Sequence, residues 1–382
     1  MTFPQKLTDK LDRRIENNAL RKLGTNSDSV DFASNDYLGF AKSQTIFEEV
    51  HTLLTSRNLQ QNGATGSRLL TGNHSLYAET ENSIATFHES QSALLFNSGY
   101  DANIGFFSSI PQKGDFIIYD ELIHASIRDG IQLSNATSYK FKHNDDEDLE
   151  RLILKAQSNA SAVIYVVTES VFSMDGDTPP LQEISNICQR NKAYLIVDEA
   201  HALGVFGNQG EGMIQLLGLQ NQVFARIITF GKGLGCHGAV ILGSTQLKIY
   251  LVNFARSLIY TTGLSPHAIA TIQIAYKHLR ENKEAREKLR ININTFNQQK
   301  QLLGMSPMFV RSKSAIQCAI IQGNERVKNI ADQLQEKGFN VKAILSPTVP
   351  EGQERLRICL HSFNSEEEIT DLLKSISLLI FY

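Results

Sequence analysis

Cysteine is scarce in this sequence, and no two cysteines lie close together. The four lie far apart in the sequence and form no Cys-x-x-Cys motif: Cys188, Cys236, Cys318 and Cys359. This spacing excludes a standard zinc ribbon, so we expect no metal site, and it is typical of a reducing compartment.

Long apolar runs and a strong charge of one sign are also missing. Residues 1–18 are mixed polar and charged, without the apolar centre of a signal peptide, and no run reaches the ~20 residues of a membrane span. With a net charge of −3, the protein is not expected to attract nucleic acid or an anionic membrane electrostatically. We therefore expect a soluble cytoplasmic protein without nucleic-acid or membrane partners.

Length and apolar content predict more than one domain. The chain has 382 residues, of which 42% are hydrophobic, and this length favours one large and one small domain. We expect an N-terminal helix and segment in residues 1–40, a large domain in 41–262 and a small domain in 263–382.

Between residues 92 and 243 the sequence repeats an apolar run, a polar loop and a helical segment. The runs are continuous rather than alternating, which is typical of strands buried on both faces, so a mostly parallel sheet covered by helices is predicted. Ligands bind such sheets at the carboxyl ends of the strands, where polar residues cluster here. The predicted strands are residues 93–96, 116–119, 162–168, 194–197, 225–229 and 239–242.

The two ends of the chain have a different pattern. Leu7, Leu11 and Ile15 recur every four residues and predict an amphipathic helix. Asn73 is predicted to cap a helix. Residues 270–300 read as one long charged helix, and strands at 340–344 and 355–360 with further helices predict a smaller α+β domain. A capping box at Ser365 and Glu368 begins the last helix.

A lysine flanked by alternating glycines follows the strand predicted at 225–229. Residues 229–235 read Thr-Phe-Gly-Lys-Gly-Leu-Gly. Glycine lets a ligand approach the backbone closely, and we interpret Lys232 as a nucleophilic amine that holds a carbonyl compound as a Schiff base. The alternative is a solvated lysine in a surface loop.

An acidic motif follows the predicted strand at 194–197. Asp-Glu-Ala-His at 198–201 is also the spelling of a helicase-type Walker B box. That reading requires Gly-x-x-x-x-Gly-Lys-Ser/Thr elsewhere. The single Gly-Lys pair is Gly231-Lys232, and Gly233 follows it where Ser or Thr is required, so the sequence argues against an ATPase. The other interpretation is that Asp198 keeps the ring nitrogen of pyridoxal 5′-phosphate (PLP) protonated while Lys232 binds its aldehyde.

Polar residues after the other strands are candidates for the same cofactor. Ser98, Gly99 and Tyr100 open a helix whose free N–H groups suit a phosphate, and the alternative is an ordinary turn. His124 could stack on the ring or lie in an exposed loop. His201 could donate to the phenolic oxygen or be a core histidine.

Two hydroxyl groups complete the candidate cofactor set. Ser173 could hydrogen-bond the cofactor or shape the Asp175-Gly176-Asp177 turn. Thr229 could reach the phosphate or be an ordinary strand residue.

Several stretches, in the same order, resemble the α-oxoamine synthases, a family of PLP enzymes with the aminotransferase type I fold. The likeness runs from about residue 7 to the end. Its motifs are Ser-Asn-Asp-Tyr-Leu-Gly at 34–39, residues 168–177, Val-Asp-Glu-Ala-His at 197–201, residues 229–235, Pro-Thr-Val-Pro at 347–350 and Arg-Leu-Arg at 355–357. Residues 63–70, 254–260 and 343–344 are similar to the 8-amino-7-oxononanoate synthase branch.

The resemblance implies a reaction and roles for individual residues. L-alanine would condense with a pimeloyl thioester of coenzyme A or acyl carrier protein, with loss of CO2, in a homodimer whose interface includes residues 63–72. Lys232, His124 and Asp198 would be catalytic. Arg357 would grip the amino acid carboxylate, and the remaining substrate contacts would be Arg21, Asn35 and Thr348.

Other functions stay open at this point. Sister enzymes join glycine to an acetyl group or serine to a fatty acyl group, and Leu345 stands where some oxononanoate synthases carry arginine. The enzyme would then rely on Arg21 or accept another acyl chain. A non-catalytic binding protein on this fold is a third possibility, against which the intact set of Lys232, Asp198 and His201 argues.

Overall fold

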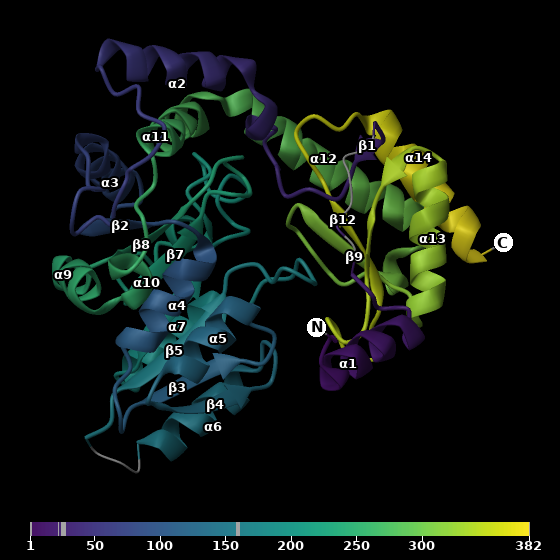
Figure 1. Ribbon diagram of the computed structural model, residues 1–382. Helices are drawn as coiled ribbons and strands as arrows, with labels where there is room; N and C mark the ends of the chain where they lie inside the picture. The colour runs from purple at the N-terminus through teal and green to yellow at the C-terminus, as the bar shows by residue number, and fades with distance from the viewer. Residues whose placement is uncertain (1, 22, 24–27, 158–160, 382) are drawn as a thin grey trace. The chain divides into compact units, whose positions relative to one another are not determined.

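The chain divides into two compact units. The computed structural model describes residues 2–21, 23, 28–157 and 161–381. The large unit comprises residues 35–173 and 178–287, and the small unit comprises residues 1–34, 174–177 and 288–382 (Figure 1).

The large unit is built on a seven-stranded sheet with the order β2-β8-β7-β6-β5-β3-β4. β8 is antiparallel to both of its neighbours and the remaining pairs are parallel, so β2 runs in the same direction as β7. This confirms the mostly parallel sheet. The six predicted strands are β2 (Ser92–Phe96), β3 (Phe116–Asp120), β5 (Ile164–Glu169), β6 (Tyr194–Asp198), β7 (Ala225–Thr229) and β8 (Ala239–Gly243).

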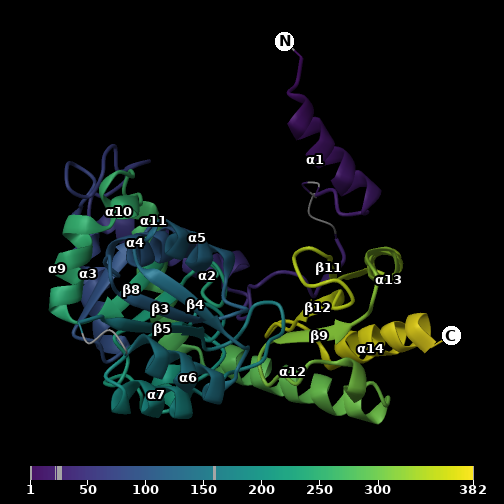
Figure 2. The same cartoon turned by 90° about the horizontal axis from the view of Figure 1, so that it is seen from below.

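Helices cover both faces of this sheet, which explains the continuous apolar runs. Val166 and Val167 are successive, fully buried residues of β5 that belong to two different core clusters. One cluster includes α4 (Gly99–Ser109), α5 (Ala125–Leu133), α9 (Thr245–Phe254) and α10 (Arg256–Ile259), and the other includes α6 (Asp146–Ala156), α7 (Leu181–Arg190) and α8 (Met213–Leu216). Figure 2 shows α4 and α5 on one side of β3 and β5, and α6 and α7 on the other.

The single helix expected at 270–300 is two helices. α11 (Pro266–Glu281) ends at Asn282, whose φ of −83° and ψ of 79° are not helical. The Asn282 Oδ1 atom accepts the Ala285 N–H at 3.0 Å and caps α12 (Lys283–Leu302). α11 packs on α2 (Gln44–Ser56) and α3 (Ser75–Phe87), so it belongs to the large unit. The small unit therefore resumes at residue 288, later than the expected 263.

Two further local features differ from the sequence expectations. β4 (Thr137–Phe141) was not expected, because it is a polar and mostly exposed strand at the edge of the sheet. α3 begins after His74, which makes no side-chain cap. The predicted cap, Asn73, instead accepts a hydrogen bond from Arg68 Nε at 3.0 Å.

The small unit contains the α+β arrangement expected for the C-terminal part. β12 (Arg355–Cys359) lies between β11 (Lys342–Ile344) and β9 (Ile316–Ile320), antiparallel to both. β1 (Val30–Asp31) pairs in parallel with β10 (Phe339–Asn340). α13 (Asn324–Glu336) and α14 (Glu366–Phe381) lie beside this sheet (Figure 1). The predicted capping box exists: Ser365 N–H donates to Glu368 at 2.8 Å, and Glu368 N–H to Ser365 Oγ at 3.1 Å.

The predicted N-terminal helix is α1 (Gln5–Glu16). Its apolar residues remain exposed, with relative exposures of 44% for Leu7, 48% for Leu11 and 58% for Ile15. Within the part of the chain that the structure describes, no helix has both the length and the apolar content needed to cross a membrane.

Candidate functional site

The polar residues that follow the strands meet at one edge of the large unit's sheet. Because β2, β3, β5, β6 and β7 run in the same direction, their carboxyl ends share this edge. A cavity of about 150 Å³ opens there. Six predicted site residues line it: Gly99, Tyr100, His124, Asp198, Thr229 and Lys232. The other lining residues are Asn103, Ser126, Glu169, Ala200 and Ile227.

Lys232 lies in the loop that reverses the chain between β7 and β8. The Gly235 N–H donates to the Lys232 carbonyl oxygen at 2.8 Å, which closes a tight turn. A Cβ atom at Gly233 would lie 2.2 Å from the Leu203 carbonyl oxygen, and one at Gly235 would lie 2.2 Å from the Ala41 nitrogen. These two glycines therefore allow close packing of backbone on backbone, rather than the approach of a ligand.

A chain of hydrogen bonds connects the lysine to the segment before α2. Lys232 Nζ lies 2.8 Å from His201 Nε2, and the Tyr37 hydroxyl lies 2.6 Å from His201 Nδ1. The same hydroxyl also lies 3.2 Å from Asn35 Oδ1, to which it can donate. His201 and Tyr37 are both buried, so the position of Lys232 Nζ is coupled to fixed groups.

Asp198 ends β6 as a buried carboxylate with two donors. Its Oδ2 atom accepts from Asn103 Nδ2 at 3.1 Å, and its Oδ1 atom accepts the Ala200 N–H at 2.9 Å. Hydrogen bonds from such donors favour the ionised form of a carboxyl group. The Asn103 Oδ1 atom is buried and has no hydrogen-bond partner among the described residues.

His124 begins α5, and its side chain caps that helix. The Nδ1 atom accepts the Ser126 N–H at 3.2 Å and lies 2.7 Å from Ser126 Oγ. Desolvation by the surrounding protein, and then the positive charge of Lys232, lower the pKa of His124. The ring is therefore held in its neutral form.

Glu169 adds a second carboxyl group to the cavity. It is buried, and its Oε1 atom accepts the His124 N–H at 2.5 Å. Burial, and then the negative charge of Asp198, raise the pKa of Glu169 well above the ordinary value of a glutamate. A nearby negative charge and the loss of contact with water both disfavour the ionised form of a carboxyl group, which explains the direction of this change in Glu169.

The amino terminus of α4 forms another wall. Ser98 caps the helix by accepting the Asp101 N–H at 3.0 Å, while the first N–H groups of an α-helix have no acceptor within it. A Cβ atom at Gly99 would lie 3.2 Å from the Thr229 Cβ atom, so the helix start and β7 pack closely at this point. Tyr100 is half exposed.

The remaining predicted residues lie outside this cavity. Ser173 follows β5 and does not line it. Arg21, Thr348 and Arg357 belong to the small unit. There Arg21 Nη2 donates to Thr348 Oγ1 at 3.4 Å, and the buried Arg357 donates to Cys359 Sγ at 3.0 Å.

Sequence reasoning gave no role to Asn103, Ser126 or Glu169. Glu169 is the last residue of an apolar run, in the same position as Asp198, and this repetition was a usable signal. Asn103 lies one helical turn after Gly99, a spacing that places both on one face of α4. Ser126 had no distinguishing signal.

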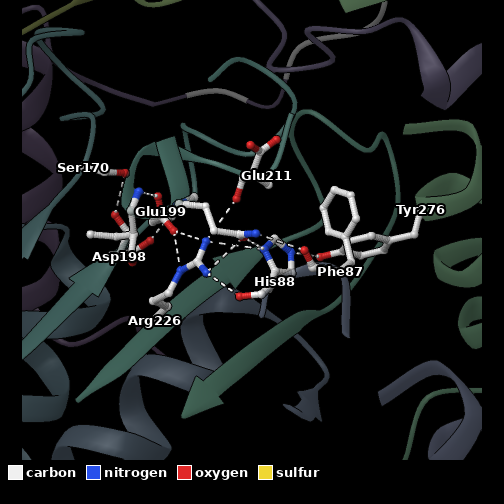
Figure 3. A network of polar contacts seen from close by, with 11 residues as sticks. Phe87, His88, Ser170, Asp198, Glu199, Glu211, Arg226 and Tyr276 are labelled. Carbon is white, nitrogen blue, oxygen red and sulfur yellow. Dashed lines mark hydrogen bonds and ion pairs between the residues drawn. The ribbon is translucent and has the colours of Figure 1, made fainter. Parts of the chain in front are cut away.

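A buried ionic network lies beside Asp198 (Figure 3). Arg226 Nε donates to Glu199 Oε2 at 2.6 Å, and other guanidinium atoms donate to the carbonyl oxygens of His88 and Glu211 at 3.1 and 3.0 Å. His88 Nε2 lies 3.0 Å from the Tyr276 hydroxyl. The network ties the end of β6 to β7 and leaves Asp198 to face the cavity. In the described ranges no group of side chains suits a metal ion.

Comparisons with known proteins extend over most of the chain. The sequence model of the aminotransferase class I and II family matches residues 27–376. A protein named 8-amino-7-oxononanoate synthase from Emericella nidulans is 42% identical over 395 residues, which cover 97% of this chain and 94% of the relative.

Two solved structures are similar as well. A serine palmitoyltransferase variant from S. paucimobilis with bound PLP-myriocin aldimine has a TM-score of 0.88 at 25% identity, covering 98% of this chain and 96% of that chain. An 8-amino-7-oxononanoate synthase from Francisella tularensis has a TM-score of 0.78 at 29% identity, covering 92% of this chain and 98% of that chain.

Proposed function

Because the chain belongs to the aminotransferase class I and II family and is related over its length to enzymes named 8-amino-7-oxononanoate synthase, we propose that it condenses L-alanine with a pimeloyl thioester. The products would be 8-amino-7-oxononanoate, CO2 and the free carrier, in a step of biotin synthesis. The family relationship confirms the fold, the PLP dependence and the acyltransferase class that the motifs implied. The substrates are our proposal.

The observation that carries the proposal is the set of groups around the cavity. The cavity is lined by the amine of Lys232, the buried carboxyl group of Asp198 and the imidazole of His124, whose lowered pKa favours its neutral form. The partnerless Asn103 Oδ1 atom leaves one polar group for a ligand to satisfy. PLP has the complementary aldehyde, ring nitrogen and aromatic face, so these residues fit it.

Each residue would have a distinct role toward the cofactor. Lys232 Nζ would attach it, and Asp198 would keep its ring nitrogen protonated. His124 would stack on the ring, while His201 and Ser173 would hydrogen-bond its edge. The phosphate would lie against the amino terminus of α4, held by Ser98, Gly99 and Tyr100 with help from the Thr229 hydroxyl.

The charges in the cavity suit this arrangement. When bound, PLP supplies an electron sink for the charge left after a Cα substituent is lost. Asp198 accepts hydrogen bonds from Asn103 and from the Ala200 N–H, which orient its carboxyl group in the cavity. The raised pKa of Glu169, caused by burial and by the charge of Asp198, favours its neutral form. Lys232 Nζ, once released by the amino acid, would move a proton at the substrate Cα atom.

Four of the predicted residues would bind the substrates. Arg357 would hold the amino acid carboxylate, since a guanidinium group can bind it through two hydrogen bonds. Asn35, Arg21 and Thr348 would contact the substrates, and the hydrogen bond between the last two supports a shared role. Leu345 cannot supply the arginine found there in some relatives, so Arg21 is the candidate for the pimeloyl carboxylate.

A second candidate is the condensation of serine with a long-chain acyl thioester. The serine palmitoyltransferase structure has a higher TM-score than the oxononanoate synthase structure, which favours it. Backbone similarity reports on the shared fold, whereas sequence identity also reports on the side chains, and the identity is 42% to the fungal relative and 25% to the palmitoyltransferase. We therefore rank the alanine reaction first.

Turnover with paired substrates tests this ranking. Alanine, glycine and serine would each be offered with pimeloyl, acetyl and palmitoyl thioesters, on coenzyme A and on acyl carrier protein, and CO2 release would be measured. We expect the fastest release with alanine and a pimeloyl thioester. No release with that pair, together with release from another, would contradict the proposal.

A further inference from the structure

Ser126 contacts one ring nitrogen of His124, and its contacts fix where that ring carries its hydrogen. We propose that Ser126 is a positioning residue that occupies the single lone pair of the neutral His124 imidazole, so that the ring hydrogen lies on Nε2. His124 then offers a hydrogen-bond donor to a ligand in the cavity and cannot take up a proton through Nε2. This inference deepens the proposed function and rests on it for the identity of the ligand.

The Ser126 hydroxyl connects two polar side chains away from water. Ser126 is 1% exposed and Asn103 is 2% exposed. The Ser126 Oγ atom lies 2.9 Å from Asn103 Nδ2 and 2.7 Å from His124 Nδ1. Across the described ranges, this oxygen has no third hydrogen-bonding partner. The backbone N–H of Ser126 also donates to His124 Nδ1, at 3.2 Å.

The Asn103 amide is a donor to Ser126. Its nitrogen lies 3.1 Å from Asp198 Oδ2 as well as 2.9 Å from Ser126 Oγ. An amide nitrogen has two hydrogens and accepts none, so it donates one to each of these oxygens. The opposite orientation would bring the amide oxygen against the Asp198 carboxylate. The Ser126 hydroxyl hydrogen therefore has no acceptor in Asn103.

Counting hydrogens then gives the tautomer of His124. The Ser126 hydroxyl has one hydrogen, and His124 Nδ1 is the one acceptor that the described residues offer it. Because the Ser126 N–H points at the same atom, Nδ1 is the unprotonated nitrogen, and a neutral imidazole then carries its hydrogen on Nε2. The other tautomer would set the Nδ1–H against the Ser126 N–H and leave the hydroxyl hydrogen without an acceptor.

Close packing of two helices holds Asn103 and Ser126 together. α4 and α5 meet at Gly130, one turn after Ser126, where a Cβ atom would lie 2.9 Å from the Asn103 carbonyl oxygen. His124 is the N-cap residue of α5, so both donors to its Nδ1 atom belong to the first turn of the same helix. The fold therefore sets the hydrogen-bond pattern of the ring in the cofactor-free protein.

The Nε2 atom is left for a ligand. His124 lines the cavity, and within the part of the chain that the structure describes its Nε2 atom has no hydrogen-bond partner. As an N–H group, Nε2 can donate to a ligand oxygen but has no lone pair with which to act as a base. The proton transfer at the substrate Cα atom would then be left to Lys232.

Nitrogen NMR of the cofactor-free protein tests the tautomer directly. Isotope-labelled histidine reports on each ring nitrogen, because protonated and unprotonated nitrogens have well-separated chemical shifts. The His124 signals are identified by their absence from His124→Asn, and the pH is set where the ring is neutral. We expect an unprotonated Nδ1 and a protonated Nε2. A hydrogen on Nδ1, or one averaged signal from both tautomers, would overturn the inference.

Ser126→Ala tests the positioning role, with Ser185→Ala as its matched control. Ser126→Ala removes the shorter donor to Nδ1, so the ratio of the Nε2–H to the Nδ1–H tautomer should fall by about two- to tenfold, the range for one hydrogen bond. Ser126→Thr keeps the hydroxyl group and should restore the wild-type ratio. Ser185 is another buried serine, whose hydroxyl donates to Gln222 Oε1 at 2.9 Å outside the cavity. Its replacement should leave the His124 signals unchanged.

An unchanged tautomer ratio in a folded Ser126→Ala protein would show that the hydroxyl does not position the ring, and the inference would be wrong. If this variant does not fold, Ser126→Cys replaces it, because a thiol keeps the size of the side chain and is a weaker donor. The wild-type spectrum needs no variant. Failure of the wild-type protein to take up PLP would contradict the proposed function alone, because the NMR experiment needs no cofactor.

Discussion

At the scale of single residues, the main feature of the site is a pair of buried carboxyl groups in different surroundings. Asp198 and Glu169 are neighbouring buried carboxyl groups at the ends of adjacent strands. Asn103 and the Ala200 N–H donate hydrogen bonds to Asp198, whereas burial and the charge of Asp198 raise the pKa of Glu169 well above its ordinary value. Environment rather than residue type therefore assigns their roles.

Replacing Asp198 with asparagine tests the first of these roles. The amide keeps the shape of the side chain but cannot stabilise a protonated ring nitrogen. We expect kcat to fall by about 100-fold or more, as when a preorganised electrostatic partner is removed. The control is Asp115→Asn, which alters a buried carboxylate that accepts the Gln112 N–H at the start of β3. Equal losses of activity in the two folded variants would contradict the assignment.

Replacing Glu169 with glutamine tests the second role through the pH dependence of stability. The raised pKa of Glu169 means that the folded chain holds this proton more tightly than the unfolded chain does. The resulting stabilisation is complete below the ordinary pKa of a glutamate and is lost as pH rises through the folded-state pKa.

Between the unfolded-state and folded-state pKa values of Glu169, the free energy of unfolding of the wild type should fall by about 1.4 kcal/mol per pH unit relative to that of Glu169→Gln. Denaturant unfolding of the cofactor-free protein at a series of pH values measures this difference. Glu48→Gln, at an exposed position on α2, should run parallel to the wild type. If the plot of unfolding free energy against pH for Glu169→Gln is also parallel to that of the wild type, the pKa of Glu169 is not raised in the folded protein.

At the scale of elements, the loop between β7 and β8 is held by backbone packing. Gly233→Ala should destabilise the protein by roughly 1–3 kcal/mol, since its Cβ atom would overlap the Leu203 carbonyl oxygen and force the loop to shift. Gly231→Ala is the matched control two residues earlier, where the nearest atom, the Cys236 carbonyl oxygen, would be 3.5 Å away. Thermal unfolding compares them, and equal melting temperatures would rule out this role for Gly233.

The secondary structure also shows how much of the fold could be predicted from the sequence alone. Strands buried on both faces have continuous apolar runs, so six strands of the large sheet were predictable. β4 was not, because an edge strand needs little apolar surface. The break at Asn282 escaped notice because both flanking helices carry similar periodic patterns.

The candidate site was predictable to a similar degree. Polar residues directly after apolar runs indicated Asp198, His124 and Lys232, and the structure brings these three together. The link between Tyr37 and His201 joins residues far apart in sequence, and the charge state of Glu169 depends on burial. Neither can be read from local sequence patterns.

At the scale of the whole molecule, the expected homodimer remains a prediction. Residues 63–72 were expected at its interface, and within them Leu69 is 52% exposed and Leu70 is 81% exposed. The Gly263 N–H donates to Gly66 at 2.9 Å, which places this loop beside the chain that follows Tyr260, itself 72% exposed. An exposed apolar patch of this kind is typical of a protein–protein interface.

Leu70→Lys should therefore convert a dimer to a monomer, as measured by sedimentation equilibrium. Leu154→Lys is the control, because it replaces an exposed leucine on α6 with the same charged side chain. A wild-type monomer, or a Leu70→Lys variant as dimeric as the wild type, would contradict this interface.

The central claim is that Lys232 is the covalent attachment point of PLP, and one experiment tests it most directly. The purified protein is loaded with PLP, reduced with borohydride and digested, and the peptides are mapped by mass spectrometry. We expect a pyridoxyl group on the peptide that carries Lys232, and none on that peptide in Lys232→Ala. A reduced protein without the adduct on Lys232, or with the adduct on another lysine, would contradict the account.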